Sequence, residues 1–492
     1  MSAAAPNVIG APKALEQADC VVLGSGPGGA VTACTLAEAG REVLLIEEGP
    51  YLSLDSCAPF SREEMLQKYR NGGITVALGA PKVAYVEGRC VGGGSEINSG
   101  LYHRTPPEIL EEWAREFRLK EASEAQLRPH FEALERELSV STMPDAPPRP
   151  SQLLQEGASK LGWKALEVPR WYRYEKTSDA KSKGARQSMT ETFVPRALKA
   201  GARLLPAARA LRIRGQGGDW RVRVEHCNAD GVKTELEVRA KNLFLACGAI
   251  QTPALLQRSG LGKHAGHALH LHSTVKVVAR FKDEINGLDL GVPVHQVKEF
   301  APRFSFGCSI GTPPYLALAL ADSPMELQAL EQDWKRRAIY YAMIRGGVGS
   351  VTALPFWRDP LVRYKHEAKD LSDLAEGLKN LCECLFAAGA ETLWPSLAGV
   401  APLKSPADLA GLPSSLPANK AMLMTIHLFS TCAMGEDQTR CTTDSFGRVH
   451  GEEDLYVADA SLLCGAPGVN PQGSVMAFAR RNALHFLGKS SG

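Results

Sequence analysis

Residues 19–49 read DCVVLGSGPGGAVTACTLAEAGREVLLIEEG, and the order of elements in this stretch decides the fold of the N-terminal part of the chain. The run CVVLG predicts a short apolar strand, GAVTACTLAEAG has the apolar spacing of a helix, and EVLLIEEG predicts a second strand. Between the first strand and the helix stands Gly24-x-Gly26-x-x-Gly29. In this context the glycine pattern predicts a turn that binds the pyrophosphate of a dinucleotide at the helix N-terminus.

Several positions of this unit have an expected role. Gly24 permits the tight turn, Gly26 lets the backbone approach a pyrophosphate, and Gly29 lets the helix pack closely on the strand. Glu47, at the end of the second strand and 18 residues after Gly29, is expected to hydrogen-bond a ribose hydroxyl. Its neighbour Glu48 is expected to be a solvated or turn residue. The unit by itself does not separate NAD from FAD.

The composition argues against several classes of protein. The 492 residues predict two to three domain-sized units, and a net charge of +2 gives no reason to expect nucleic acid as a partner. No apolar run reaches the ~18 residues that span a bilayer, and the N-terminus lacks the basic start and apolar centre of a signal peptide. The twelve cysteines are scattered without a repeated CxxC pair, which favours a reduced, cytoplasmic chain without a metal site.

Three later segments also carry glycine-rich or strand-like patterns. They read GRCVGGGSEINSGLYHR (88–104), KNLFLACGAIQTPALLQRSGLG (241–262) and LYVADASLLCGAPGVNPQGSVMAFA (455–479). Together with the N-terminal unit, they resemble the glucose–methanol–choline (GMC) family of FAD oxidoreductases. The resemblance implies an α/β fold: a Rossmann-like FAD-binding domain with a parallel sheet, and a substrate domain built on a mostly antiparallel sheet with helices.

The resemblance also implies how the two domains share the chain. The FAD-binding domain is expected to be discontinuous and the substrate domain to fill the intervals, with the ranges 15–115, 190–275 and 425–492 for the first and 116–189 and 276–424 for the second. Within the substrate domain, TVKVVARF, RFSFGCSI, RAIYYAMIR and GVGSVTALP predict strands of one sheet, and SPMELQALEQDWKRR and residues 371–390 predict helices. Its candidate pocket residues, which the sequence cannot sort into inward and outward sets, are Phe304, Phe306, Tyr340, Tyr341, Phe356 and Trp357.

The family resemblance implies further cofactor contacts. Gly92, Gly93 and Gly94 would let the backbone pass close to the pyrophosphate or the isoalloxazine ring. Asn98 resembles the asparagine on the ring side of the flavin, and the backbone of Ala210 falls where the family holds adenine.

Asp459 stands at the end of the predicted strand DLYVADAS, where ligands bind in open α/β sheets. In the family this acid faces the ribityl chain of FAD; a turn or cap aspartate is the alternative. Ile97 occupies the place where some members attach FAD through a histidine, so the cofactor is expected to be bound non-covalently. His103 is expected to be a surface or packing histidine.

The resemblance places the catalytic pair near the C-terminus. The segment MTIHLFSTCAMG supplies His427 as general base, and GVNPQG supplies Asn470 to orient the substrate oxygen, 43 residues later. Asn470 and Pro471 are also expected to start a helix, with Asn470 as its N-cap and Pro471 at its first position. The dipole of this helix would face the pyrimidine edge of the flavin.

Two other groups of residues are read as structural. His264, His267, His270 and His272 lie in HAGHALHLH without a cysteine or carboxylate to complete a ligand set, so we expect solvated loop and strand residues and no metal. Cys382 and Cys384 lie in one helix at a spacing of two, which points their thiols in different directions.

The sequence therefore predicts an FAD-dependent oxidoreductase that oxidises an alcohol to an aldehyde or ketone by hydride transfer to flavin N5. Oxygen and a quinone or other carrier remain alternative electron acceptors, and neither the alcohol nor the oligomeric state is predicted. Rival hypotheses are a hydroxynitrile-lyase-like or light-driven decarboxylating flavoenzyme on the same scaffold, and a flavin-binding protein without catalysis. A plain NAD dehydrogenase is disfavoured because it would not need segments 88–104 and 455–479.

Overall fold

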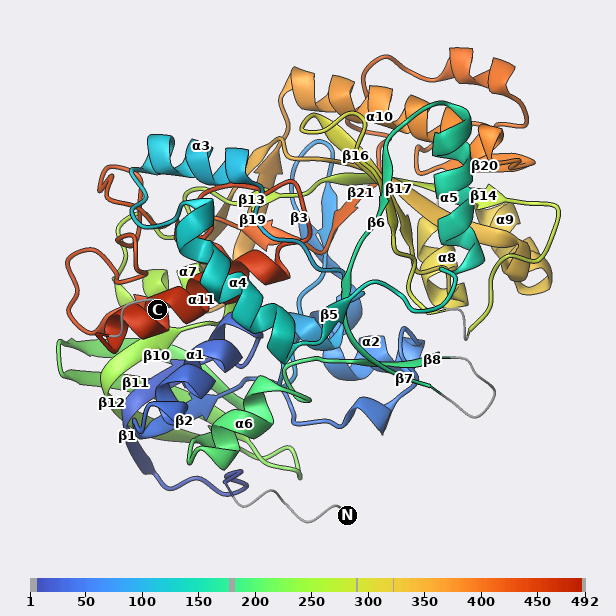
Figure 1. Ribbon diagram of the computed structural model, residues 1–492. Coiled ribbons are helices and arrows are strands. Elements are labelled where there is room, and N and C mark those ends of the chain that lie inside the picture. The colour runs from blue at the N-terminus through green and yellow to red at the C-terminus, as the bar shows by residue number, and fades with distance from the viewer. Residues whose placement is uncertain (1–6, 177–181, 289–290, 322, 489–492) are drawn as a thin grey trace.

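A computed structural model describes residues 7–176, 182–288, 291–321 and 323–488. Two large sheets dominate the described residues, one of seven strands and one of nine. Figure 1 shows the seven-stranded sheet with its helices at the lower left and the nine-stranded sheet beneath helix α10 at the upper right.

The first sheet is built on the N-terminal strand–helix–strand unit. Its strand order is β10-β11-β12-β1-β2-β9, and β23 also pairs with β12. The strands β12, β1, β2, β9 and β23 run parallel, and β10 and β11 form an antiparallel edge. Parallel strands buried on both faces read as continuous apolar runs, which explains CVVL and VLLI. The bounds are β1 (Leu15–Leu23), β2 (Val43–Ile46), β9 (Arg203–Leu205), β10 (Ala208–Gln216), β11 (Asp219–Cys227), β12 (Lys233–Leu245) and β23 (Leu455–Val457).

Helix α1 (Pro27–Glu38) is enclosed by its neighbours. It packs against strand β1 and against α6 (Phe193–Lys199) and α11 (Gln472–Phe486), while α4 (Glu124–Glu137) packs on α11. Nine of its twelve residues are buried, so its apolar residues are not confined to one stripe. The predicted Rossmann-like unit is confirmed.

The second sheet is mostly antiparallel, as predicted. Its order is β3-β4-β21-β14-β17-β16-β15-β6, with β20 also paired to β14; β4 and β21 are parallel neighbours. The bounds are β3 (Thr75–Ala77), β4 (Val83–Tyr85), β6 (Ala165–Glu167), β14 (Thr274–Arg280), β15 (His295–Val297), β16 (Phe304–Ser309), β17 (Arg337–Ile344), β20 (Thr392–Pro395) and β21 (Leu423–Thr425).

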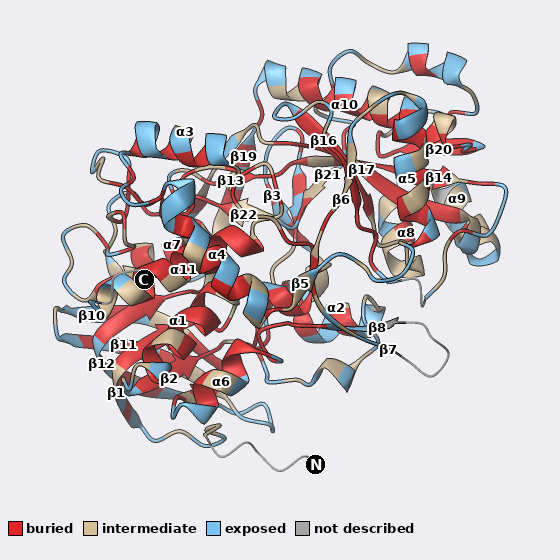
Figure 2. Cartoon of the chain, viewed as in Figure 1, coloured by how far each residue is buried: buried red, intermediate tan, exposed pale blue. Residues whose placement is uncertain are grey.

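Helices cover both faces of this sheet. Because side chains alternate along a strand, Val277 and Ala279 of β14 join the core beneath α10 (Ala368–Ala387) and α5 (Arg149–Lys160). Val278 joins a smaller core beneath α8 (Pro313–Ala319) and α9 (Pro324–Asp333). Figure 2 shows α10 with buried residues toward the sheet and exposed residues on its outer side, the pattern that predicts an amphipathic helix.

One predicted strand of the second sheet lies elsewhere. The segment GVGSVTALP forms β18 (Val348–Thr352), which pairs with β19 (Leu361–Lys365) in a separate two-stranded sheet. The chain leaves β17 through a turn at Gly347, whose φ of +92° redirects the next strand away from the nine-stranded sheet.

The division into two domains stays a proposal. Strands β3 and β4 fall in the range predicted for the FAD-binding domain, yet they pair with β21 in the second sheet. Helix α4, from a range predicted for the substrate domain, packs on α11 beside the first sheet. The chain therefore passes between the two sheets more often than the predicted boundaries require.

The structure also sorts the six candidate pocket aromatics. Phe304, Phe306 and Tyr340 belong to the buried core beneath α10. Tyr341 is half-buried on the opposite face of β17, because it follows Tyr340 directly in the strand. Phe356 and Trp357 are exposed on the connection between β18 and β19.

The described residues contain no disulfide, no helix suited to span a bilayer and no cluster of metal ligands. All twelve cysteines are free, including Cys382 and Cys384, which are both buried in α10. Within the described residues, none of the helices combines the length and apolar character needed to cross a bilayer. The described residues likewise contain no group of three or more His, Cys, Asp or Glu arranged to hold a metal ion.

The buried ring of His366 gives a pH-dependent test of the fold. Its Nε2 lies 2.8 Å from Oγ of Ser273, and burial lowers the pKa of His366 to about 4. The unfolded ring takes up a proton below about pH 6.5 and the folded ring does not, so the free energy of unfolding falls as the pH falls through this window.

Compared with His366→Gln, the wild-type protein should therefore lose stability more steeply below about pH 6.5, by up to about 1.4 kcal/mol per pH unit. Urea unfolding of both proteins at several pH values between neutral and weakly acid measures the two slopes. Equal slopes would show that His366 does not resist protonation in the folded state.

Candidate functional site

One cavity brings together most of the residues singled out in the sequence. It has a volume of about 250 Å³ and is lined by segments of both sheets. Among the predicted site residues, those that line it are Gly24, Gly26, Glu47, Gly93, Gly94, Asn98, Ala210, His427, Asp459, Asn470 and Pro471. Gly29 and Gly92 are not among the lining residues; Gly29 packs on Gly24, and the N–H of Gly92 donates to Oγ of Ser25.

The two glycine-rich segments meet at the start of α1. A Cβ atom added to Gly93 would lie 2.8 Å from Cα of Gly26, so a side chain at Gly93 would force the segments apart. Gly29 packs equally closely on the turn, because its Cβ would lie 1.9 Å from O of Gly24. In the described chain no side chain caps the N-terminus of α1 and its first turn contains no acidic residue. The backbone N–H groups there are therefore free to bind an anionic group.

Glu47 connects this turn to the end of β2. Its Oε2 accepts hydrogen bonds from the backbone N–H of Ser25 at 3.0 Å and from the Ser25 hydroxyl at 2.7 Å, and its Oε1 accepts from the N–H of Gly49 at 2.9 Å. Oγ of Ser25 in turn accepts from the N–H of Gly92 at 3.1 Å. Sequence reasoning missed Ser25, which ties both glycine segments together. A carboxylate accepts about four hydrogen bonds, so Glu47 retains capacity for a ligand hydroxyl.

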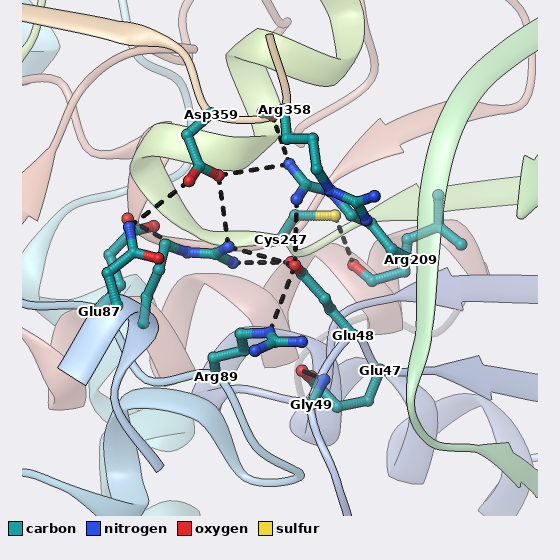
Figure 3. Close-up of polar contacts among 12 residues, drawn as sticks. Glu47, Glu48, Gly49, Glu87, Arg89, Arg209, Cys247, Arg358 and Asp359 are labelled. Carbon is teal, nitrogen blue, oxygen red and sulfur yellow. Dashed lines mark hydrogen bonds and ion pairs between the residues drawn. The ribbon is translucent and has the colours of Figure 1, made fainter. Parts of the chain in front are cut away.

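Glu48 is not the solvated residue that the sequence predicted. Figure 3 shows its carboxylate between Arg89 and Arg209, and Arg70 donates to it at 2.7 Å. Burial by itself would raise the pKa of Glu48, but the guanidinium groups of Arg70 and Arg209 lower it to about 2. Asp359, from the connection between β18 and β19, closes the same network through Arg70 and Arg209. The prediction failed because these partners come from segments distant in sequence.

The middle of the cavity carries Asn98 and Ile97. Nδ2 of Asn98 donates to Oε1 of Gln472 at 2.7 Å, which links the glycine-rich segment to the first residue of α11. Ile97 lines the wall with its side chain, which offers no atom for a covalent bond to a cofactor. Ala210 lies in β10 next to a register shift between β10 and β11, where its backbone borders the cavity.

Asp459 is held entirely by protein donors. Oδ2 accepts from the N–H of Gly248 at 2.9 Å and the hydroxyl of Thr252 at 2.6 Å, and Oδ1 accepts from the N–H and hydroxyl of Ser461 at 2.8 and 2.5 Å. The side chain thus caps the short helix η6 (Ala460–Leu462). Burial raises the pKa of Asp459 despite these hydrogen bonds. The cap alternative is therefore present in the structure, and any ribityl contact of this residue stays a proposal.

The start of α11 differs from the prediction. The N-cap residue is Pro471 and no side chain caps the helix, so the expectation that Asn470 is the cap was wrong. Oδ1 of Asn470 instead accepts a hydrogen bond from Nε2 of Gln296 at 3.0 Å. The glutamine lies in β15, so the tertiary contact with the second sheet outweighs the local capping preference. The uncapped helix N-terminus still borders the cavity through Pro471 and Gln472.

His427 faces the cavity beside a second histidine that sequence reasoning classed as solvated. His272 is fully buried, and its Nδ1 lies 3.0 Å from Nδ1 of His427. The pair arises because β13 (His270–Leu271) and β22 (Leu428–Phe429) are antiparallel, with Leu271 opposite Leu428. The sequence carried no signal for this pair, because the alternation in HALHLH puts the histidines on the strand face opposite the leucines and so predicts exposed histidines.

The environment of these histidines disfavours a positive charge. Burial, followed by the charge of Lys298, lowers the pKa of His427 to about 4. Burial also lowers the pKa of His103 to about 3 and that of Lys298 to about 8. His103 is half-buried near Gln296 and His427 and is not a surface residue. Around neutral pH, His427 is therefore an uncharged imidazole.

The cavity fits a flavin dinucleotide by its own geometry. Glycine backbone and the open N-terminus of α1 suit the pyrophosphate, and Glu47 suits a ribose hydroxyl. The open N-terminus of α11 suits an electron-rich ring edge at the other end.

Comparisons with known proteins agree with this arrangement. Residues 65–274 and 349–479 match models described as GMC oxidoreductase, and residues 22–77 match an NAD(P)-binding Rossmann-like domain. A GMC-type oxidoreductase of Sinorhizobium fredii is 39% identical over 482 residues, which cover 96% of this chain and 95% of the relative. A long-chain-alcohol oxidase of Arabidopsis thaliana is 25% identical over 504 residues, covering 94% of this chain and 66% of that protein.

Among solved structures, pyridoxine 4-oxidase from Mesorbium loti superposes with a TM-score of 0.72 at 18% identity, covering 96% of this chain and 99% of that one. This likeness shows a shared fold. The family models and the 39% identical relative, taken with the two joined glycine segments, lead to one conclusion: this chain belongs to the GMC oxidoreductase family.

Proposed function

We propose that this protein is an FAD-dependent oxidoreductase that oxidises an alcohol to an aldehyde or ketone. The observation that carries the proposal is that His427 and Asn470 line the same cavity as Gly26 and Gly93, beside the open N-terminus of α11. A dinucleotide site and a pair of polar groups suited to a hydroxyl oxygen thus share one space. The similarity to an enzyme named long-chain-alcohol oxidase supports an alcohol as the substrate class.

In this proposal each part of the cavity holds one part of the cofactor. The turn at Gly26 and the N-terminus of α1 bind the pyrophosphate, Glu47 binds the adenosine ribose, and the backbone of Ala210 borders adenine. Gly94 and Asn98 lie on the ring side, and the region of Asp459 borders the ribityl chain. When bound, FAD would supply the acceptor, its N5, for the hydride of the carbinol carbon.

The chain's own residues position the substrate. Asn470 is held by Gln296 and His427 by His272, so both side chains have fixed positions relative to the cavity. Both are uncharged near neutral pH, which lets them hydrogen-bond a hydroxyl without an ion-pair partner. The neutral imidazole of His427 then acts as the general base that takes the hydroxyl proton.

Two further features stay proposals. Oxygen or a quinone-type carrier would reoxidise the flavin, and the oxidase named among the relatives favours oxygen. The twelve free cysteines favour a reducing compartment such as the cytoplasm.

An anaerobic screen tests the proposed function. The FAD-loaded protein is mixed with aromatic, aliphatic, sugar and sterol alcohols, and loss of the visible flavin absorbance is recorded. We expect at least one class to bleach the flavin and to yield the carbonyl product. A protein that keeps its yellow colour with every class would instead support the lyase-like, decarboxylating or non-catalytic alternatives.

The link between cofactor and chain gives a separate prediction. Because Ile97 offers no nucleophile, the purified yellow protein should release all of its FAD into the supernatant on acid or heat denaturation, at about one FAD per chain. The absorbance of supernatant and pellet measures this. Flavin that stays with the precipitated chain would show a covalent bond at another residue, and a colourless protein unable to take up FAD would end the assignment.

A further inference from the structure

One face of the nine-stranded sheet is uncovered at its β3 end. Ile74, Val76 and Leu78 point to the same side, because they alternate with the buried Thr75 and Ala77. Ile74 is 80% exposed, and Val76 and Leu78 are exposed as well. An exposed apolar area made of neighbouring side chains marks a surface that contacts a protein or a membrane.

Two more exposed side chains extend this area across the sheet. Met422 and Ile426 flank β21 and alternate with its buried residues, so they share a side with Met424. Met424 pairs with Ala84 of β4, and Ala84 pairs with Val76 of β3. We call the exposed apolar side of these three neighbouring strands the open sheet face. Its residues are Ile74, Val76, Leu78, Met422 and Ile426.

The same side of the sheet continues inward toward the cavity. Met424 pairs with Thr274 of β14, and Thr274 pairs with Met343 of β17. Met343 in turn pairs with Ser305 of β16. Met424 and Thr274 are half-buried, whereas Met343 and Ser305 are buried, so this row of side chains becomes covered from β21 to β16. Because Ile426 also lines the cavity, the open sheet face reaches the cavity wall.

Two aromatic side chains project from the connection between β18 and β19. Phe356 is fully exposed, and Trp357 is 71% exposed. Phe356 has a φ of +67°, a left-handed conformation that bulky residues rarely adopt. Ion pairs hold the next two residues, because Arg358 pairs with Glu225 at 2.6 Å and Asp359 pairs with two arginines of the cavity wall. The chain thus presents two exposed rings from a fixed base.

This connection lies beside the open sheet face. The backbone N–H of Leu78 donates to O of Val362 at 2.9 Å, and the N–H of Tyr364 donates to O of Leu78 at 2.9 Å, so β19 lies along β3. Nδ2 of Asn71 lies 3.5 Å from Oδ2 of Asp359, near the start of β3. The two aromatic rings and the open sheet face are therefore parts of one apolar surface.

Exposed cations border this surface. Arg363 lies opposite Leu78 in the bridge between β19 and β3. Lys365 pairs in register with the exposed Val348 of β18, and Lys82 lies in the turn between β3 and β4. In the ranges that the structure describes, none of these three cations has a hydrogen bond or an ion pair with its side chain. Their charges are available to an anionic partner.

The charges favour a lipid bilayer over a second copy of the chain as this partner. In a symmetric dimer the surface would meet itself, so its unpaired cations would face each other. A bilayer with anionic headgroups offers the opposite charge to the cations and apolar chains to the rings, and tryptophan is favoured at its interface. We propose that the open sheet face, together with Phe356 and Trp357, binds the surface of an anionic lipid bilayer.

Co-sedimentation with vesicles tests this proposal. FAD-loaded protein is mixed with vesicles of phosphatidylcholine alone or of phosphatidylcholine with phosphatidylglycerol, and the bound fraction is measured. We expect binding to the mixed vesicles to be about ten-fold or more tighter, because each cation near an anionic surface adds to the attraction. Added salt should reduce this difference, since it screens exposed charges.

The aromatic residues are tested by a double variant, Phe356→Asn with Trp357→Ser. It should bind both kinds of vesicle about ten-fold or more weakly, because it loses two apolar side chains that enter the bilayer. Asparagine tolerates the left-handed backbone at position 356, so the variant should remain folded. The matched control is Leu15→Ser with Val232→Ser, which removes exposed apolar side chains at the first sheet and should leave binding unchanged.

The cations are tested by Arg363→Gln with Lys365→Gln. This variant should lose about ten-fold of its binding to the mixed vesicles and keep its binding to phosphatidylcholine. Brominated lipids then locate the contact, because they quench the fluorescence of a tryptophan that enters the bilayer. The quenching should disappear in Trp357→Phe, which keeps an aromatic ring and should still bind.

Wild-type protein that stays in the supernatant with the mixed vesicles would overturn the inference, as would an aromatic double variant that binds as tightly as the wild type. A stable dimer in sedimentation velocity that becomes a monomer in the aromatic variant would also overturn it, because a second copy would then cover the open sheet face. Thermal unfolding of each variant separates lost binding from lost folding, and the quenching of Trp357 tests the contact in a nearly unchanged chain.

Discussion

Flavin reduction in His427→Ala should be about 10²–10³-fold slower than in the wild-type protein, with FAD still bound. The expected loss is that of the general base that the sequence predicts at His427, which is typically worth about 10²–10⁴-fold in rate. FAD should stay bound because the glycine segments and Glu47, which are proposed to hold it, lie in other parts of the cavity wall. Anaerobic stopped-flow reduction, with the FAD content of each sample measured beforehand, gives the ratio of rates.

The matched control for this experiment is His366→Ala, which also removes a buried ring whose pKa is lowered to about 4. It should reduce stability without slowing flavin reduction, since Ser273 is its hydrogen-bond partner and not a cavity group. A wild-type rate in His427→Ala would remove this residue from the chemistry altogether. Loss of FAD in the same variant would show that His427 supports the cofactor and not the substrate.

Gly26→Ala is expected to fold but to bind FAD about 10–100-fold more weakly, the effect of losing one hydrogen bond to a charged group. A Cβ atom at Gly26 would come no closer than 4.0 Å to Cα of Gly93, and the backbone is extended with φ −63° and ψ −176°. The protein itself thus tolerates the methyl group. The methyl would stand in the cavity, between the turn and the pyrophosphate.

Gly28→Ala provides the contrast at a position two residues away. Its Cβ would lie 1.9 Å from the backbone O of Ala458, so β23 and α1 would have to separate. We expect this variant to lose folded protein as well as cofactor. FAD titration by fluorescence and thermal unfolding of the cofactor-free proteins distinguish the two cases. Equal FAD affinity in Gly26→Ala and wild type would show that the pyrophosphate does not approach this turn.

Local patterns sufficed for several parts of the molecule. The unit of residues 19–49 was predictable because apolar spacing and glycine positions are set by backbone geometry over a few residues. The same holds for α10, whose buried leucines follow the helical period. The antiparallel character of the second sheet and the catalytic pair depended on the resemblance to the GMC family and not on periodicity.

Other features required partners from distant parts of the chain. Glu48 reads as an exposed acid, but Arg70 and Arg209 reach it from two other segments and remove it from solvent. Asn470 has the local signature of a helix cap, but Gln296 of β15 takes its Oδ1. In both cases tertiary hydrogen bonds or ion pairs replaced the solvent or backbone partner that the local sequence would supply.

By itself, then, the sequence determined the dinucleotide-binding turn, the pattern of helices and strands around it, and the residue types at the catalytic pair. Only the tertiary structure decided which side chains surround that pair. His272 and His427 are 155 residues apart, and the antiparallel pairing of β13 with β22 sets them opposite each other. Nε2 of His272 accepts a hydrogen bond from the backbone N–H of Gly468, from a third segment. The hydrogen-bond partners of a buried side chain come from every segment that packs around it, so local sequence does not determine them.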